Sequence, residues 1–168
     1  MQIFTAMDKS LKFNEIKSYL DQMDLKVIGM DDARPWGGFF VIDENDSTKF
    51  INLFFPVLDK SSLAGGKISP KILMVQPGKK LSWQYHHRRS EVWKLIDGEA
   101  AVAKSDTDEE AERIQLHKGD IVELKQGERH RLIGLEDWGV VAEIWVHTDH
   151  SNPSNEDDIV RLQDDFGR

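Results

Sequence analysis

The stretch between Gly78 and Gly98 limits what this chain can fold into more than any other part of the sequence. It places Gln84 and His86 two residues apart, so on a strand both side chains point to the same side. Glu91 follows after a polar, basic segment that suits a short bend. All three residue types can bind a metal ion, so the segment offers three candidate ligands and a fourth must come from elsewhere.

His130 is the candidate for the fourth ligand, three positions after Gly127 in a segment that begins at Gly119. Two imidazoles, one carboxylate and one amide oxygen make a mixed nitrogen and oxygen set that suits zinc, iron, manganese or nickel. A single Gln, Glu or His on a strand is more often surface or hydrogen-bonded structure than a ligand. The prediction of a metal site therefore depends on all four residues occurring together.

The two segments resemble the two sequence motifs of the cupin family. The first motif is filled by Gly78, Gln84, His86, Glu91 and Gly98, with Gln84 in place of the first His. The second is filled by Gly119, Gly127 and His130, with Lys125 in place of a Pro. The resemblance implies an all-β fold, the cupin double-stranded β-barrel or jelly roll.

The segment from Gln84 to Trp93 is similar to the signature of type II phosphomannose isomerases. The segment 34–37 and the tail 156–168 also resemble that cupin domain, so the similarity covers roughly residues 33 to 168. The resemblance implies a metal-dependent aldose–ketose isomerase that interconverts mannose 6-phosphate and fructose 6-phosphate. Gln84 also matches type I phosphomannose isomerases, which argues against a generic oxygenase, since an oxygenase usually keeps the first His.

The implied cofactor is one divalent metal ion, with zinc favoured, held by Gln84, His86, Glu91 and His130. Basic residues near the ligands suit an anionic substrate such as a sugar phosphate. The family pattern implies substrate binding by Arg34, Arg89 and Arg161, with a catalytic role for Arg161. Lys71, expected to face inward, is a further catalytic candidate. The base that moves a proton between the two sugar carbons is not identified by the sequence.

Composition limits the partners of this 168-residue chain. Its net charge of -8 disfavours binding to nucleic acid or to an acidic membrane surface. It contains no cysteine, which excludes disulfides and cysteine catalysis. Neither a signal peptide nor an apolar membrane span is evident. We expect a cytoplasmic protein with a small sugar or sugar phosphate as its partner, and a homodimer stays open.

Along the chain we expect residues 1–30 to form an N-terminal helical extension and residues 31–168 the barrel domain. Residues 8–23 have apolar positions near helical spacing, and short strands separated by turn residues follow from Lys71 onward. Residues 50–58 predict a further strand, and the C-terminus a short helical tail. Residues 47–66 are longer than the family pattern and are expected to cover the mouth of the barrel.

Three alternative functions remain open from the sequence. One is an isomerase of a different or unphosphorylated sugar, such as lyxose. Another is a non-catalytic sugar-binding or regulatory cupin, which the complete set of metal ligands argues against. A dioxygenase is the third. No Gly-rich nucleotide loop precedes Arg34, so we do not expect nucleotide transfer.

Overall fold

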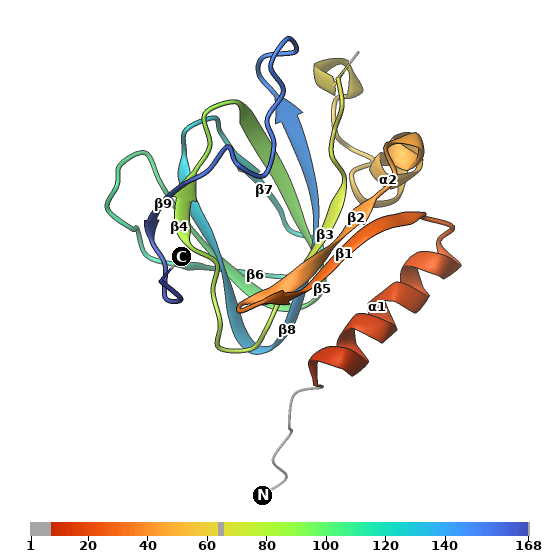
Figure 1. Ribbon diagram of the computed structural model, residues 1–168, viewed down its shortest axis with the longest axis horizontal. Coiled ribbons are helices and arrows are strands. Elements are labelled where there is room, and N and C mark those ends of the chain that lie inside the picture. The colour runs from red at the N-terminus through yellow and green to blue at the C-terminus, as the bar shows by residue number, and fades with distance from the viewer. Residues whose placement is uncertain (1–7, 64–65, 168) are drawn as a thin grey trace, which may run out of the picture.

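The computed structural model describes residues 8–63 and 66–167 as a curled β-sheet with helices along its outside (Figure 1). The helices are α1 (Lys9–Gln22) and α2 (Ser47–Phe54), and 3₁₀ turns η1 and η2 span Glu44–Asp46 and Lys60–Leu63. The strands are β1 (Val27–Arg34), β2 (Gly37–Ile42), β3 (Lys71–Val75), β4 (Trp83–Tyr85), β5 (Arg89–Ser105), β6 (Ile114–Leu116), β7 (Ile121–Leu124), β8 (Arg129–His147) and β9 (Val160–Gln163). Among the described residues, no helix has both the length and the apolar character needed to cross a membrane.

The two longest strands, β5 and β8, pair antiparallel along most of their length. The strand β5 runs through Gly98 and bends at irregularities on either side of it. Gly98 has a φ of 74°, and a Cβ atom there would lie 1.7 Å from the carbonyl oxygen of Trp138. Only glycine fits this bend, because any side chain would meet the backbone of β8.

The other strands extend this pair into a barrel (Figure 1). On one side β3 pairs with β8, and β2 and β1 follow in order. Near the start of β8, β4 pairs with it and carries β9 on its other edge. The short strands β6 and β7 pair with β5. The all-β jelly-roll barrel expected from the resemblance is therefore confirmed.

Alternation along β3 separates the inside of the barrel from the outside. Ile72 and Met74 belong to an outer apolar cluster that also includes buried residues of α1 and α2. Leu73 and Val75 belong to an inner cluster within the barrel. Lys71 is two residues before Leu73, so its side chain shares the inner face. A buried lysine on that face is the first structural sign of a polar interior.

The N-terminal helix is confirmed close to its predicted bounds. Asp8 caps α1 by accepting a hydrogen bond from the Leu11 amide at 3.0 Å. Phe13 packs against Phe40 of β2, with ring centroids 5.3 Å apart, and so fixes the helix to the sheet. The division of the chain at residue 30 stays a prediction, and residues 1–7 lie outside the described part.

Three expectations about local structure are wrong. Residues 50–58 do not form a strand, because Phe50, Ile51 and Phe54 recur at helical spacing and bury one face of α2. The tail forms β9 instead of a helix, since β4 offers it an edge of unpaired backbone groups. Within the described part of residues 47–66, α2 packs its apolar face in the outer cluster and no residue lines the pocket, so this part does not cover the mouth; residues 64 and 65 lie outside the described part.

Candidate metal centre and pocket

Three neighbouring segments bring the predicted ligands together inside the barrel. Gln84 on β4 lies directly opposite His130 on β8. His86 follows the end of β4, and Glu91 lies near the start of β5. Ligand atoms of His86, Glu91 and His130 all lie within 4.8 Å of one another, and all three residues are buried. The spacing in the sequence therefore does correspond to a cluster in space.

Backbone carbonyls fix the orientation of both histidines. The Nδ1 atom of His86 lies 2.7 Å from the carbonyl oxygen of Asp158, and that of His130 lies 2.9 Å from the carbonyl oxygen of Glu128. A carbonyl oxygen only accepts, so each Nδ1 carries hydrogen and a neutral ring keeps its lone pair on Nε2. Both Nε2 atoms then face Glu91, as metal ligands held by outer partners do.

Two features of the cluster favour the binding of a cation. His130 Nε2 is buried without a hydrogen-bond partner among the described residues. His86 Nε2 lies 2.8 Å from Glu91 Oε1, closer than two acceptor atoms approach without a positive charge beside them, and Arg89, 3.2 Å from each atom, supplies part of that charge. A divalent metal would satisfy both atoms at once, so the donor set fits such an ion.

The charge states of the cluster also suit a metal. Burial lowers the pKa of His130 to about 4, so its ring is neutral at physiological pH. Burial alone would raise the pKa of Glu91, but the neighbouring His86 and Arg89 outweigh it and hold that pKa well below its usual range. A neutral imidazole and an ionised carboxylate are the forms that bind metal.

Gln84 lies beside the cluster but turns its amide nitrogen toward it. Its Nε2 atom lies 3.5 Å from His86 Nε2, whereas its Oε1 atom accepts a hydrogen bond from Ser82 Oγ at 2.5 Å. The prediction had the amide oxygen as the ligand. A half-turn of the amide about its last bond would present that oxygen to a metal, and the amide nitrogen would then face Ser82.

Arg89, expected to bind substrate, is held in the wall of the site. Its Nε atom donates to Glu91 Oε1 at 3.2 Å, and its Nη1 atom donates to Ser154 Oγ at 2.8 Å and to the Asn155 carbonyl at 3.1 Å. Its guanidinium also lies 3.6 Å above the ring of Trp145. These contacts suit a residue that positions Glu91 better than one that releases its donors to a ligand.

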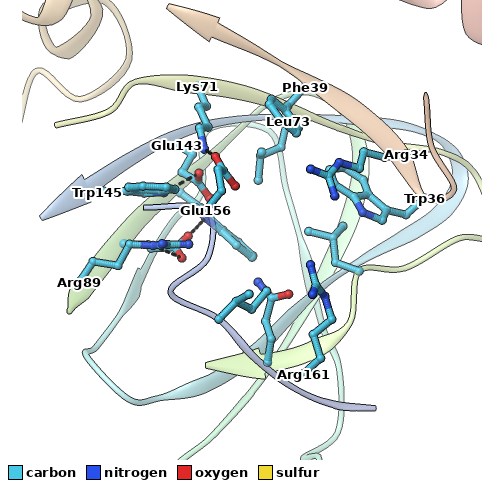
Figure 2. Close-up of a pocket in the computed structure, with 15 residues that line it drawn as sticks. Arg34, Trp36, Phe39, Lys71, Leu73, Arg89, Glu143, Trp145, Glu156 and Arg161 are labelled. Atoms are coloured by element: carbon cyan, nitrogen blue, oxygen red, sulfur yellow. Dashed lines mark hydrogen bonds and ion pairs between the residues drawn. The ribbon is translucent and has the colours of Figure 1, made fainter. Parts of the chain in front are cut away.

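A pocket of about 90 Å³ opens beside the cluster and contains the remaining predicted residues (Figure 2). Arg34 enters from the end of β1, where its Nε atom pairs with Asp31 at 2.9 Å. Arg161 enters from β9, and its backbone pairs with that of Gln84 on β4. Lys71 enters from β3 and forms an ion pair with Glu156. The structure thus gathers Arg34, Lys71 and Arg161 around one cavity.

Two carboxylates of the pocket were missed by the sequence reasoning. Glu143 on β8 accepts hydrogen bonds from the indole nitrogens of Trp93 at 2.7 Å and Trp145 at 2.9 Å. Burial and the charge of Glu91 raise the pKa of Glu143 to about 8. Glu156 reaches the pocket from the segment before β9. A single Glu within the apolar stretch 139–147 was the available signal for Glu143.

The fold and this site define a cupin barrel with a candidate metal centre beside a pocket lined by both cations and carboxylates. Comparison with known families agrees with that class. The family model described as "Mannose-6-phosphate isomerase C-terminal" matches residues 55–164. The chain belongs to this family.

Curated relatives resemble the chain at modest identity. The xanthan biosynthesis protein XanB of Xanthomonas campestris pv. campestris (strain B100) is 27% identical over 94% of this chain. The mannose-1-phosphate guanylyltransferase ManC of Salmonella typhimurium is 28% identical over 80% of it. The matched regions make up 29% and 22% of those two proteins, so the chain spans less than a third of their length.

Solved structures support the fold. The capsular polysaccharide assembling protein CapF of Staphylococcus aureus superposes with a TM-score of 0.53 at 16% identity, over 83% of this chain and 34% of that one. Vicilin of hazelnut, Corylus avellana, superposes with a TM-score of 0.54 at 13% identity, over 82% and 36%. At such identities the likeness concerns the barrel alone.

Proposed function

We propose that this chain is a metal-dependent sugar-phosphate isomerase that interconverts mannose 6-phosphate and fructose 6-phosphate. The observation that carries the proposal is the buried cluster of His86, Glu91 and His130 with the unpartnered Nε2 atom of His130. Family membership supports the same reaction. Gln84 completes the proposed ligand set once its amide oxygen faces the cluster, and zinc is the preferred ion for these donors.

The charges of the pocket support an anionic substrate. Arg34, Lys71 and Arg161 bring three cationic side chains to one cavity beside the cluster. Arg34 and Arg161 present planar guanidinium groups, which suit two-point recognition of phosphate. A neutral sugar would not need this concentration of positive charge, so lyxose is the weaker candidate substrate.

The isomerisation moves a proton between two adjacent sugar carbons. A bound divalent cation would polarise the oxygens on those carbons as a Lewis acid. Lys71 and Arg161 would place positive charge where negative charge develops on the substrate. Glu143 is the pocket carboxyl that two indoles hold in position, and we assign it the role of carrying the proton.

Metal analysis of the purified protein, combined with an isomerase assay on mannose 6-phosphate, tests the proposal. We expect about one divalent ion per chain and formation of fructose 6-phosphate. The His130→Gln variant should lose both, whereas His117→Gln should lose neither, because the side chain of His117 is 80% exposed and lies outside the cluster.

Other outcomes of this assay select the alternatives. Turnover of lyxose without turnover of mannose 6-phosphate would reassign the substrate. A bound metal with no turnover of any hexose or pentose, phosphorylated or not, would favour a non-catalytic sugar-binding protein. Oxygen consumption by an iron-loaded protein would favour a dioxygenase. A protein that binds no divalent metal at neutral pH would overturn the proposal itself.

A further inference from the structure

The two partners of the ion pair between Lys71 and Glu156 differ in their exposure to solvent, and this difference affects ligand binding. The side chain of Lys71 is only 7% exposed, whereas that of Glu156 is 56% exposed. Separation of a buried charge from its partner is costly, because the charge left behind has no water to replace it. A half-exposed carboxylate, in contrast, can turn into water at little cost. The pair can therefore open only if Glu156 leaves and another anion takes its place.

The surroundings of Lys71 keep its ammonium group in the pocket when Glu156 leaves. Its Nζ atom lies 4.0 Å from the ring centroid of Trp145 and 5.3 Å from that of Phe39. These rings hold a cation by its attraction to their faces and leave its remaining donors directed at the cavity. Figure 2 shows the carboxylate of Glu156 next to Lys71, inside the space that a ligand would use.

The backbone around Glu156 is anchored on both sides. Ser154 accepts a hydrogen bond from Arg89 at 2.8 Å. The carboxylate of Asp158 accepts hydrogen bonds from the backbone amides of His87 at 2.9 Å and Arg88 at 3.0 Å. Glu156 lies between these anchors, so its side chain can swing outward while the segment stays attached. Rotations of exposed side chains take picoseconds to nanoseconds, so this motion would not limit binding.

The small size of the cavity also favours such a motion. Its volume of about 90 Å³ is well below the roughly 300 Å³ at which small-molecule sites usually begin. Glu156 is one of the residues that line it. Removal of this side chain from the pocket both enlarges the cavity and exposes the positive charge of Lys71.

We propose that Glu156 is a built-in competitor for the anionic group of the ligand, which binds Lys71 only after displacing the Glu156 carboxylate. The inference rests on the proposed function in one respect, that the pocket takes an anionic ligand. It makes Glu156 a residue that determines specificity. A phosphate can replace the carboxylate at Lys71, whereas a neutral sugar has no charged group that competes with Glu156 for the ammonium.

Calorimetric titration of the metal-loaded full chain with mannose 6-phosphate, inorganic phosphate and neutral mannose tests this competition. The Glu156→Gln variant removes the charge and keeps the shape of the side chain. If the ion pair is formed about 90% of the time, its loss should strengthen binding of both phosphate probes about tenfold. The Asp157→Asn variant is the matched control, because it removes the same charge from the neighbouring exposed residue.

Each outcome decides the inference separately from the isomerase activity. Tighter binding of both phosphates by Glu156→Gln than by Asp157→Asn, with mannose unchanged, supports competition even if no isomerisation is found. If affinity increases only for mannose 6-phosphate, the competition lies at a site that needs the sugar. If affinity increases only for free phosphate, no sugar phosphate fits the site. Either result contradicts the inference. An affinity within twofold of the control, an equal gain for mannose, or no phosphate binding by the variant would overturn it, whatever the protein turns over.

Discussion

The Nδ1 atom of His86 lies 2.7 Å from the main-chain carbonyl oxygen of Asp158, which ties a predicted metal ligand to the segment before the last strand. The carboxylate of the same aspartate accepts hydrogen bonds from the two backbone amides that follow His86 and from Ser154 Oγ at 2.6 Å. One residue thus orients the ligand and holds the turn that carries it. Such outer partners affect metal affinity nearly as much as the ligands do.

The first prediction concerns the carboxylate of Asp158. Asp158→Ala should lower the free energy of unfolding by about 2 kcal/mol, because two part-buried backbone amides and the buried hydroxyl of Ser154 lose their acceptor. Metal affinity should fall roughly tenfold as the turn after His86 loosens. Urea denaturation and a zinc titration measure the two effects. Asp157→Ala should change neither, and equal behaviour of the two variants would show that the turn does not need the carboxylate.

The second prediction concerns pH and Lys71. The charged groups that face Lys71 are Glu143 on β8, Arg89 and Glu91 on β5, Arg34 on β1 and Glu156 before β9. Burial lowers the pKa of Lys71 to about 8, although Glu143 acts in the opposite direction. The ammonium form is present below that pKa and is lost above it.

Affinity for mannose 6-phosphate should therefore fall as the pH rises through about 8, a range in which a phosphate ester, with a second pKa near 6, remains a dianion. Lys71→Arg should show a shallower fall in phosphate affinity across the same range, because a guanidinium stays charged and only Glu143, whose pKa is also about 8, still changes its charge. Titrations at intervals between pH 6.5 and 9.5 measure this. If wild type and Lys71→Arg showed parallel profiles of phosphate affinity against pH, Lys71 would not belong to the anion site.

The third prediction concerns acid stability and His130. The folded chain binds the proton of His130 only near pH 4, whereas an unfolded histidine binds it near 6.5. Between these values the unfolded chain holds more protons, so the free energy of unfolding decreases as the pH falls. The full contribution is on the order of 3 kcal/mol.

Urea denaturation of the metal-free protein in a chelator, at pH values from 7 to 4, measures this contribution. His130→Gln should show a shallower loss of stability than wild type. His117→Gln should match wild type, because His117 is exposed. If His130→Gln retained the full slope, the acid sensitivity would come from other groups.

The fourth prediction concerns Arg161. Its side chain lines the pocket from an exposed strand, so Arg161→Ala should leave folding and metal content nearly unchanged. If Arg161 acts on the substrate, kcat/KM should fall tenfold or more, on the order of 1.4 kcal/mol of transition-state binding. Arg113→Ala, which removes an exposed arginine outside this pocket, is the control. Normal turnover by Arg161→Ala would limit the residue to packing.

The sequence was most informative where local spacing and strand geometry coincide. Gln84 and His86 share a side because strands alternate, and the turn glycines mark where strands end. The contacts of Arg89 with Ser154 and Asn155 were not foreseen, because these partners lie far along the chain and no local pattern reports such contacts. Its expected role in substrate binding stays a prediction. The strand at 160–163 depends on an edge that only the folded β4 provides. Propensity could not indicate it, since so short a segment takes the structure its neighbour imposes.

The pairing of β9 with β4 also determines how the pocket fluctuates. The strand is short, lies at an edge, and exposes Arg161, Leu162 and Gln163. Elements with few buried contacts open with less free energy than the core, so amide hydrogens of β9 should exchange with solvent long before those of β5 and β8. Each such opening lifts Arg161 away from the cavity while the long strand pair stays intact. The wall of the site formed by β9 therefore opens transiently, while the pair of β5 and β8 that supports the site stays closed.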